Sequence, residues 1–140
     1  MNANPGSILI FGCGYLGRRV ATACAANGRR VFAVTRSQNT AAEFRESGWQ
    51  PVVADITKPD SLGDLPETDG VLFAVGFDRT AGIPIEDVYV TGLKNVLERL
   101  PRFSNERQRF IYISSTGVYG QTNGDWVDDC LLYTSDAADE

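Results

Sequence analysis

The sequence predicts an α/β protein with a doubly wound parallel sheet, in which strands run in one direction and helices cover both faces. Short runs rich in β-branched and aromatic residues alternate with segments of helical periodicity. The strand-like runs are apolar almost throughout, as in strands that are buried on both faces. A glycine-rich turn follows the first run. A chain of 140 residues, 43% hydrophobic and 22% charged, is long enough for one such domain.

The first half of the chain alternates three expected strands with two expected helices. Each strand is a short run of Val, Ile, Phe or similar residues, and each helix ends at a glycine in a C-capping position. In the first helix, Val20, Ala21 and Cys24 share one face. The expected strands are 7–11, 30–36 and 49–56, and the expected helices are 18–28 and 39–48.

The second half continues the alternation. The turn-rich segment 57–69 supports at most one helical turn, and it precedes a strand at 70–76, a helix at 85–100 and a fifth strand at 109–114. Because crossovers between parallel strands are right-handed, a doubly wound sheet is the leading topology. The apolar residues that recur at helical spacing in the last helix are Val88, Leu93, Val96, Leu97 and Leu100.

Composition restricts the class of partner. No apolar run approaches the roughly 18 to 20 residues that a membrane span needs, and MNANPGS has no basic region leading into a signal-peptide core, so a cytoplasmic protein is expected. The three cysteines, Cys13, Cys24 and Cys130, are widely spaced, and the chain has no histidine, which argues against a disulfide framework and a zinc site. The net charge is −5 and the basic residues form no stripe, so nucleic acid is disfavoured and a small-molecule partner is expected.

The last eleven residues, CLLYTSDAADE at 130–140, have no helix or strand period. The string resembles one translated frame of a sequencing-library adapter, and it is expected to be a non-native tail; the alternative is a native disordered terminus. Its three acidic residues, Asp136, Asp139 and Glu140, account for most of the net charge, because residues 1–129 carry −2 without them. On this reading residues 1–129 are one incomplete domain, truncated after the fifth strand.

The strongest motif is GCGYLG, at the junction of the first strand and the first helix. Gly12, Gly14 and Gly17 have the G-x-G-x-x-G spacing. In a Rossmann fold the first glycine forms a tight turn, the second lets the backbone approach a pyrophosphate, and the third allows close packing of helix on strand. Exposed amides and the helix dipole then hold the anion. The motif therefore predicts dinucleotide binding, against the alternative of a structural glycine turn.

Arg36 ends the second strand, where NAD-binding proteins usually place an acidic residue against the ribose 2′-hydroxyl. A guanidinium suits a 2′-phosphate, so NADP is favoured over NAD. The alternative is that Arg36 only faces solvent at the strand end. Asp55 follows the third strand, where it would lie beside the adenine edge or act only as a turn former.

Four segments in this order, GCGYLG, ADI, FAVG and ISSTGVYG, resemble the extended and atypical short-chain dehydrogenase/reductases, the NAD(P)-dependent epimerase/dehydratase superfamily. The resemblance spans residues 8 to about 129. Within it, SSTGVYG followed by GDWVDD is most similar to the sugar-nucleotide-epimerase-like oxidoreductases. The resemblance implies an oxidoreductase or epimerase whose small-molecule substrate is a candidate sugar nucleotide.

The resemblance also implies roles for particular residues. Ser115 occupies the family's catalytic serine position, where a hydroxyl binds the substrate oxygen that undergoes hydride chemistry; the alternative is a hydroxyl that satisfies local backbone. The implied cofactor contacts are the pyrophosphate cradle Gly12, Gly14, Tyr15, Leu16 and Gly17, the adenine neighbours Asp55 and Ile56, and the nicotinamide-side ribose wall Ala74, Val75 and Gly76.

The catalytic serine of such enzymes works with a tyrosine whose pKa is lowered by a lysine four residues on. Tyr119 is too close to Ser115 for this role, and Tyr133 lies in the tail with Ala137 where the lysine would be. The chain is therefore expected to be an inactive fragment of an active enzyme. The alternative is a non-catalytic dinucleotide-binding sensor, while a methyltransferase is disfavoured because no acid ends the second strand.

Overall fold

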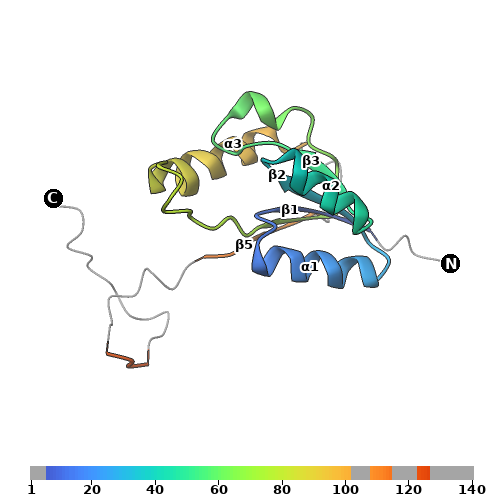
Figure 1. Cartoon of the computed structure of the whole chain (residues 1–140), viewed down its shortest axis with the longest axis horizontal. Helices are drawn as coiled ribbons and strands as arrows, with labels where there is room; N and C mark the ends of the chain where they lie inside the picture. Colours follow the sequence, from blue (N-terminus) through green and yellow to red (C-terminus); the bar gives the residue numbers. More distant parts are fainter. Residues whose placement is uncertain (1–5, 102–107, 115–122, 127–140) are drawn as a thin grey trace.

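The computed structural model describes residues 6–101, 108–114 and 123–126. They form a five-stranded sheet in the order β3-β2-β1-β4-β5, and every neighbouring pair is parallel (Figure 1). This order confirms the doubly wound Rossmann topology, with five strands in the described residues. The strands are β1 (Ser7–Phe11), β2 (Arg30–Thr35), β3 (Gln50–Val53), β4 (Gly70–Phe73) and β5 (Arg109–Tyr112).

Helices cover both faces of the sheet. Alternate side chains of β1 point to opposite faces: Ile8 and Ile10 pack against α1 and α2, whereas Leu9 and Phe11 pack toward α3. Figure 1 shows α1 and α3 on opposite sides of the sheet. The helices are α1 (Tyr15–Ala26), α2 (Gln38–Glu46), the 3-10 turn η1 (Pro59–Leu62), the π-helical turn η2 (Asp87–Thr91) and α3 (Gly92–Arg99).

Two elements differ from the sequence prediction. The first helix begins at Tyr15 rather than at residue 18, because the third glycine of the motif is helical and not part of the turn. The segment predicted as one helix over 85–100 contains a π-helical turn before α3, which shifts the buried face. As a result Leu97, expected in the core, is 52% exposed, while Val96 is fully buried.

The fifth strand is also less covered than its apolar sequence suggested. In β5, Ile111 is 51% and Tyr112 is 42% exposed, although the same sequence pattern predicted burial on both faces. Among the described residues, the strand pairs on one side only, with β4. The prediction of a sheet covered on both faces is therefore confirmed for β1 and wrong for β5.

The carboxyl edge of the sheet is held from the α3 side. The buried Asn95 Nδ2 donates a hydrogen bond of 2.8 Å to the Ile56 carbonyl, just after β3. Gly92 lets α3 lie close to Ile56, because a Cβ at residue 92 would come within 2.7 Å of the Ile56 Cδ1. These contacts fix the backbone that follows β3. Within the described ranges, no helix is long and apolar enough to cross a membrane.

Candidate functional site

A cavity of about 380 Å³ lies where the loops following β1, β2, β3 and β4 converge. β1 is the point at which the strand order reverses, since its chain neighbour β2 lies on one side and β4 on the other. Ligands of open α/β sheets bind at such a switch point, outside the carboxyl ends of the strands. The volume lies within the roughly 300 to 1,000 Å³ range of small-molecule sites.

Gly12 follows β1 directly, and its backbone lies close to the loop after β4. Its φ is +85°, a conformation that side chains strongly disfavour. A Cβ at this position would also overlap the Ala74 carbonyl and come within 2.6 Å of the Val75 amide nitrogen. The loop after β1 can therefore lie against the loop after β4 only if residue 12 is glycine.

Gly14 and Gly17 differ in what surrounds them. At Gly17, a Cβ would overlap the Gly12 carbonyl, so this glycine permits the close packing of α1 on β1. At Gly14, a Cβ would meet nothing within 4 Å, and this residue lines the cavity. No packing among the described residues therefore requires glycine at residue 14, whereas a ligand approaching the backbone would require it.

The first turn of α1 can receive an anion. Gly14 is the N-cap and provides no side-chain hydrogen bond, and no acidic residue lies in the first turn. Amides at a helix start lack intrahelical acceptors and carry the positive end of the dipole. Tyr15 and Leu16 point largely into solvent, with exposed fractions of 78% and 41%, and the Tyr15 ring lies 4.0 Å from the Arg19 guanidinium.

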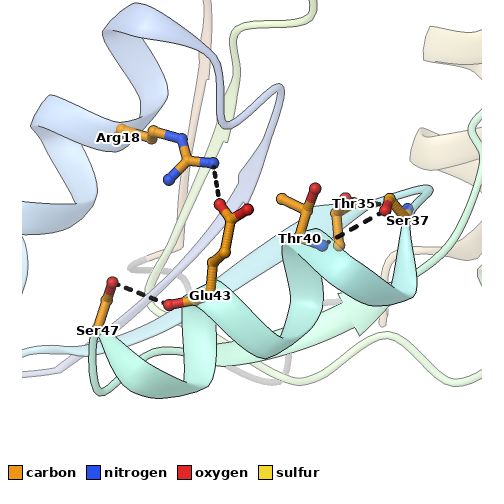
Figure 2. Close-up of polar contacts among 6 residues, drawn as sticks. All are labelled: Arg18, Thr35, Ser37, Thr40, Glu43 and Ser47. Atoms are coloured by element: carbon orange, nitrogen blue, oxygen red, sulfur yellow. Dashed lines mark hydrogen bonds and ion pairs between the residues drawn. The ribbon is translucent and has the colours of Figure 1, made fainter.

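Arg36 lies in the turn between β2 and α2 and lines the cavity with its exposed side chain. The turn is ordered by its neighbours: the Ser37 amide donates to Thr35 Oγ1 at 3.1 Å, and the Thr40 amide donates to Ser37 Oγ at 3.4 Å, which caps α2 (Figure 2). None of the ion pairs within the described residues uses the Arg36 guanidinium.

Helices α1 and α2, which both begin at the cavity, are linked by a salt bridge. Arg18 of α1 forms a 3.0 Å ion pair with Glu43 of α2, and Figure 2 shows the two side chains bridging the helices. The Arg18 guanidinium also lies 5.1 Å from the centre of the buried Phe44 ring. Because both helices start at the cavity, this bridge helps to hold the glycine loop and Arg36 in fixed relation.

The wall after β3 contains Asp55 and Ile56, both of which line the cavity. Asp55 Oδ1 accepts hydrogen bonds from the Thr57 amide at 3.0 Å and from Thr57 Oγ1 at 2.8 Å. The two alternatives for Asp55 are thus compatible, because one oxygen forms the turn while the residue remains at the cavity. Ile56 is buried and contributes an apolar surface.

The wall after β4 contains Val75, Gly76 and Asp78, and Ile83 further along the same loop. Asp78 Oδ1 accepts from Thr80 Oγ1 at 2.6 Å and from the Thr80 amide at 2.9 Å. These hydrogen bonds, with a smaller contribution from the charge of Arg36, lower the pKa of Asp78. The side chain is therefore a carboxylate near neutral pH.

Cys13 lies between the first two glycines and also lines the cavity. Its Sγ donates a weak hydrogen bond of 3.9 Å to the Ile10 carbonyl. Burial raises the pKa of this thiol to about 11, and the nearby charge of Arg18 lowers it only in part. Cys13 is thus a protonated, weakly polar side chain at neutral pH and is no nucleophile.

The cavity brings together seven of the residues expected from the sequence: Gly12, Gly14, Arg36, Asp55, Ile56, Val75 and Gly76. Tyr15, Leu16 and Gly17 form the adjoining first turn of α1, and Ala74 contributes the carbonyl against which Gly12 packs. Ser115, the expected catalytic residue, lies outside the described residues, as does the tail 130–140.

Sequence reasoning missed other lining residues. Thr35 is the last residue of β2 and Thr40 lies in the first turn of α2, and the position of Thr35 at a strand end could have suggested it. Asp78, Ala81 and Ile83 lie in a loop without periodicity, so only the rule that ligands bind beyond strand ends pointed toward them.

Comparison with known proteins agrees with this geometry. The NAD dependent epimerase/dehydratase family matches residues 8–135, which is most of the chain. Among curated proteins, no significant match is found. A short-chain dehydrogenase/reductase superfamily protein from Agrobacterium tumefaciens, solved with bound NAD, is 25% identical with a TM-score of 0.62, and the match covers 81% of this chain and 34% of that one.

Two further solved structures are similar. A functionally unknown conserved protein from Silicibacter pomeroyi is 27% identical with a TM-score of 0.61, over 95% of this chain and 43% of that one. A candidate NAD-dependent epimerase/dehydratase from Bacillus halodurans shares the fold at 23% identity and a TM-score of 0.61, over 81% of this chain and 53% of that one. The chain thus spans about a third to a half of the length of these structures.

A Rossmann sheet with a glycine loop at its switch point defines the class of nucleotide-binding α/β domains. Within this class, the chain belongs to the NAD dependent epimerase/dehydratase family. It is an NAD(P)-binding Rossmann domain, the type of domain that holds a nicotinamide dinucleotide. The residues present fit that cofactor, since the open position at Gly14 and the uncapped start of α1 leave room and amides for a pyrophosphate.

Proposed function

We propose that this chain is the cofactor-binding part of an NADP-dependent oxidoreductase or epimerase, whose substrate is a small molecule with a hydroxyl or keto carbon, such as a sugar nucleotide. One observation carries the proposal: a single cavity contains the glycine loop, Arg36, the Asp55–Ile56 wall and the Val75–Gly76 wall. That set supplies a group for each part of a dinucleotide.

The chain's own residues would divide the binding between them. The amides at the start of α1 would hold the pyrophosphate, with Gly14 allowing close approach. Arg36 would form charge-assisted hydrogen bonds to the 2′-phosphate, and its position in a capped, ordered turn reduces the entropy lost on binding. Ile56 and Ile83 would provide apolar surface for the adenine, and Asp55 would lie at its polar edge.

The chemical step would use a residue beyond the described part of the chain. When bound, a nicotinamide ring supplies hydride transfer to or from the substrate carbon. Ser115 would donate a hydrogen bond to the substrate oxygen, where charge develops in the transition state. In the sequence Ser115 comes after β5, whose carboxyl end lies at the same edge of the sheet as the cofactor loops.

A non-catalytic dinucleotide sensor with the same fold is the second candidate, and residues outside this sequence decide between it and an enzyme. No tyrosine among the 140 residues has a lysine four positions later, so the acid/base pair of such enzymes does not occur in this sequence. The 140-residue chain is expected to bind NADP weakly and to turn nothing over. Measurable steady-state oxidation or reduction by this chain would contradict that expectation.

The test of the proposal measures NADP⁺ and NAD⁺ dissociation constants by calorimetry for the natural sequence and for Arg36→Ala. A charge-assisted hydrogen bond contributes roughly 1.5 to 3 kcal/mol, so Arg36→Ala is expected to weaken NADP⁺ by about one to two powers of ten and to change NAD⁺ little. Arg45→Ala is the matched control, because Arg45 lies at the end of α2, away from the cavity lining. An unchanged NADP⁺/NAD⁺ ratio in Arg36→Ala would overturn the assigned selectivity.

A further inference from the structure

We propose that Asp78 is a second determinant of cofactor selectivity, which opposes Arg36 by placing a negative charge at the cavity that receives the 2′-phosphate. The inference rests on the proposed function: Arg36 is proposed to favour NADP over NAD, and Asp78 is proposed to reduce that preference. Arg36 and Asp78 both line the cavity, from the loops after β2 and β4 respectively. Because β1 lies between these strands, the two side chains approach the cavity from different walls.

The Asp78 carboxylate is held in place rather than free to turn away. Both of its hydrogen bonds from Thr80, through the hydroxyl and the amide, end on Oδ1. The two bonds form a local turn that fixes the side-chain torsions. The second oxygen, Oδ2, accepts no hydrogen bond from any residue in the described ranges, and it carries its share of the charge at a defined position.

The charged side chains of the cavity explain why the negative charge of Asp78 would affect NADP more than NAD. The charged side chains of the lining are Arg36, Asp55 and Asp78, which is one cation against two anions. The pKa of Asp78 is lowered, so it remains ionised over the neutral range. A 2′-phosphate adds a charge of about −1.5 to −2, whereas a 2′-hydroxyl adds none. Repulsion from Asp78, and its attraction of the Arg36 guanidinium, therefore disfavour NADP more than NAD, because both carry the pyrophosphate but only NADP carries the additional 2′-phosphate charge.

The local turn at Asp78 does not require a charged side chain. The rest of its loop offers Ala81 and Ile83 to the cavity, and neither side chain bonds with Asp78. The turn with Thr80 needs only the Oδ1 acceptor, which asparagine also possesses. Asparagine at residue 78 would thus keep the local hydrogen bonds and remove only the charge, which makes the charge itself testable.

The experiment measures binding of adenosine 2′,5′-bisphosphate and of 5′-AMP by calorimetry with the 140-residue chain. The two probes differ only by the 2′-phosphate, and they need neither the nicotinamide half of the site nor a substrate. The variants are Asp78→Asn, Arg36→Ala and the matched control Asp64→Asn, which removes one acidic charge from an exposed turn outside the cavity lining.

Asp78→Asn is expected to tighten the bisphosphate on the order of threefold to tenfold, as for one screened unit charge, and to change 5′-AMP less than twofold. The gain should shrink when the ionic strength is raised, since screening weakens it. An unchanged bisphosphate/5′-AMP ratio, or the same change in Asp64→Asn, overturns the inference. Failure of the unsubstituted chain to bind either probe overturns the proposed function instead, and with it this inference.

Discussion

β1 and β5 look alike in the sequence but differ in the structure. Each is a short run of mainly apolar residues, and each pairs with β4 in the parallel sheet. All five residues of β1 are buried, whereas Ile111 of β5 is 51% exposed. A buried-strand pattern thus indicates that a strand belongs to the sheet, but the strand order decides how well it is covered.

The functional regions at the ends of these two strands differ in the same way. After β1, the backbone at Gly12 is packed against Ala74, and the glycine loop joins a cavity bounded by three other loops. After β5, the described residues Ile113 and Ser114 are exposed. The cavity proposed to hold the cofactor therefore lies within the described residues, whereas Ser115, to which the chemical step is assigned, lies outside them.

The largest expected effect separates the two strands directly. Leu9→Ala in β1 removes a fully buried side chain from the core and is expected to lower the free energy of unfolding by about 2 to 5 kcal/mol. Ile111→Ala in β5 removes a half-exposed side chain and should cost about 1 kcal/mol or less. Urea unfolding of both variants measures the difference. Equal losses would show that β5 is as well packed as β1.

A smaller effect is expected at the end of β1. Gly12→Ala places a side chain at a φ of +85° and against the Ala74 carbonyl, so the loops must separate. The strain is expected to lower stability by about 1 to 3 kcal/mol and to weaken dinucleotide binding as well. Thermal unfolding and calorimetry on the same sample measure both. Full stability in Gly12→Ala would mean that the contact with Ala74 is not required.

The smallest effect concerns the opposite edge of the sheet, where the strands begin. Asp69 Oδ2 accepts hydrogen bonds from the Ser7 amide at 2.7 Å and from Ser7 Oγ at 3.0 Å, and these bonds lower the pKa of Asp69. A carboxyl whose pKa is depressed in the folded state adds stability above its unfolded value of about 4, and this stability is lost as the pH falls through the folded value. The midpoint of thermal unfolding should thus fall more between pH 6 and pH 3 for the natural sequence than for Asp69→Asn. Parallel curves for the two proteins would exclude this contribution.

Particular residues show how far the sequence could predict this molecule. The order of strands and helices, and the place of the glycine motif between the first strand and the first helix, followed from periodicity and glycine spacing. The exposure of Leu97 could not be predicted in this way, because a π-helical turn before α3 rotates the later residues relative to a regular helix. The exposure of Ile111 could not be predicted from periodicity either, since the order of the strands in the sheet sets which residues cover it.

The residues of the candidate site likewise fall into those that the sequence could predict and those that it could not. Gly12, Gly14 and Arg36 were predictable because a motif or a strand end fixes their positions before any tertiary contact forms. Asp78 and Ile83 were not, because their loop has no period and reaches the cavity only through the fold. Polar residues just beyond the end of a parallel strand are thus worth testing even where no motif includes them.

The central claim is that the glycine loop binds a dinucleotide, and Gly14 tests it most directly. A Cβ at residue 14 meets nothing within 4 Å among the described residues, so Gly14→Ala should cost only the difference between glycine and alanine at an N-cap, about 1 kcal/mol or less, and lower the thermal unfolding midpoint by a few degrees at most. The same Cβ would stand where the pyrophosphate approaches the backbone, so NADP⁺ and NAD⁺ should both bind about tenfold more weakly or worse by calorimetry. Unchanged affinity for both dinucleotides in a stably folded Gly14→Ala would contradict the account.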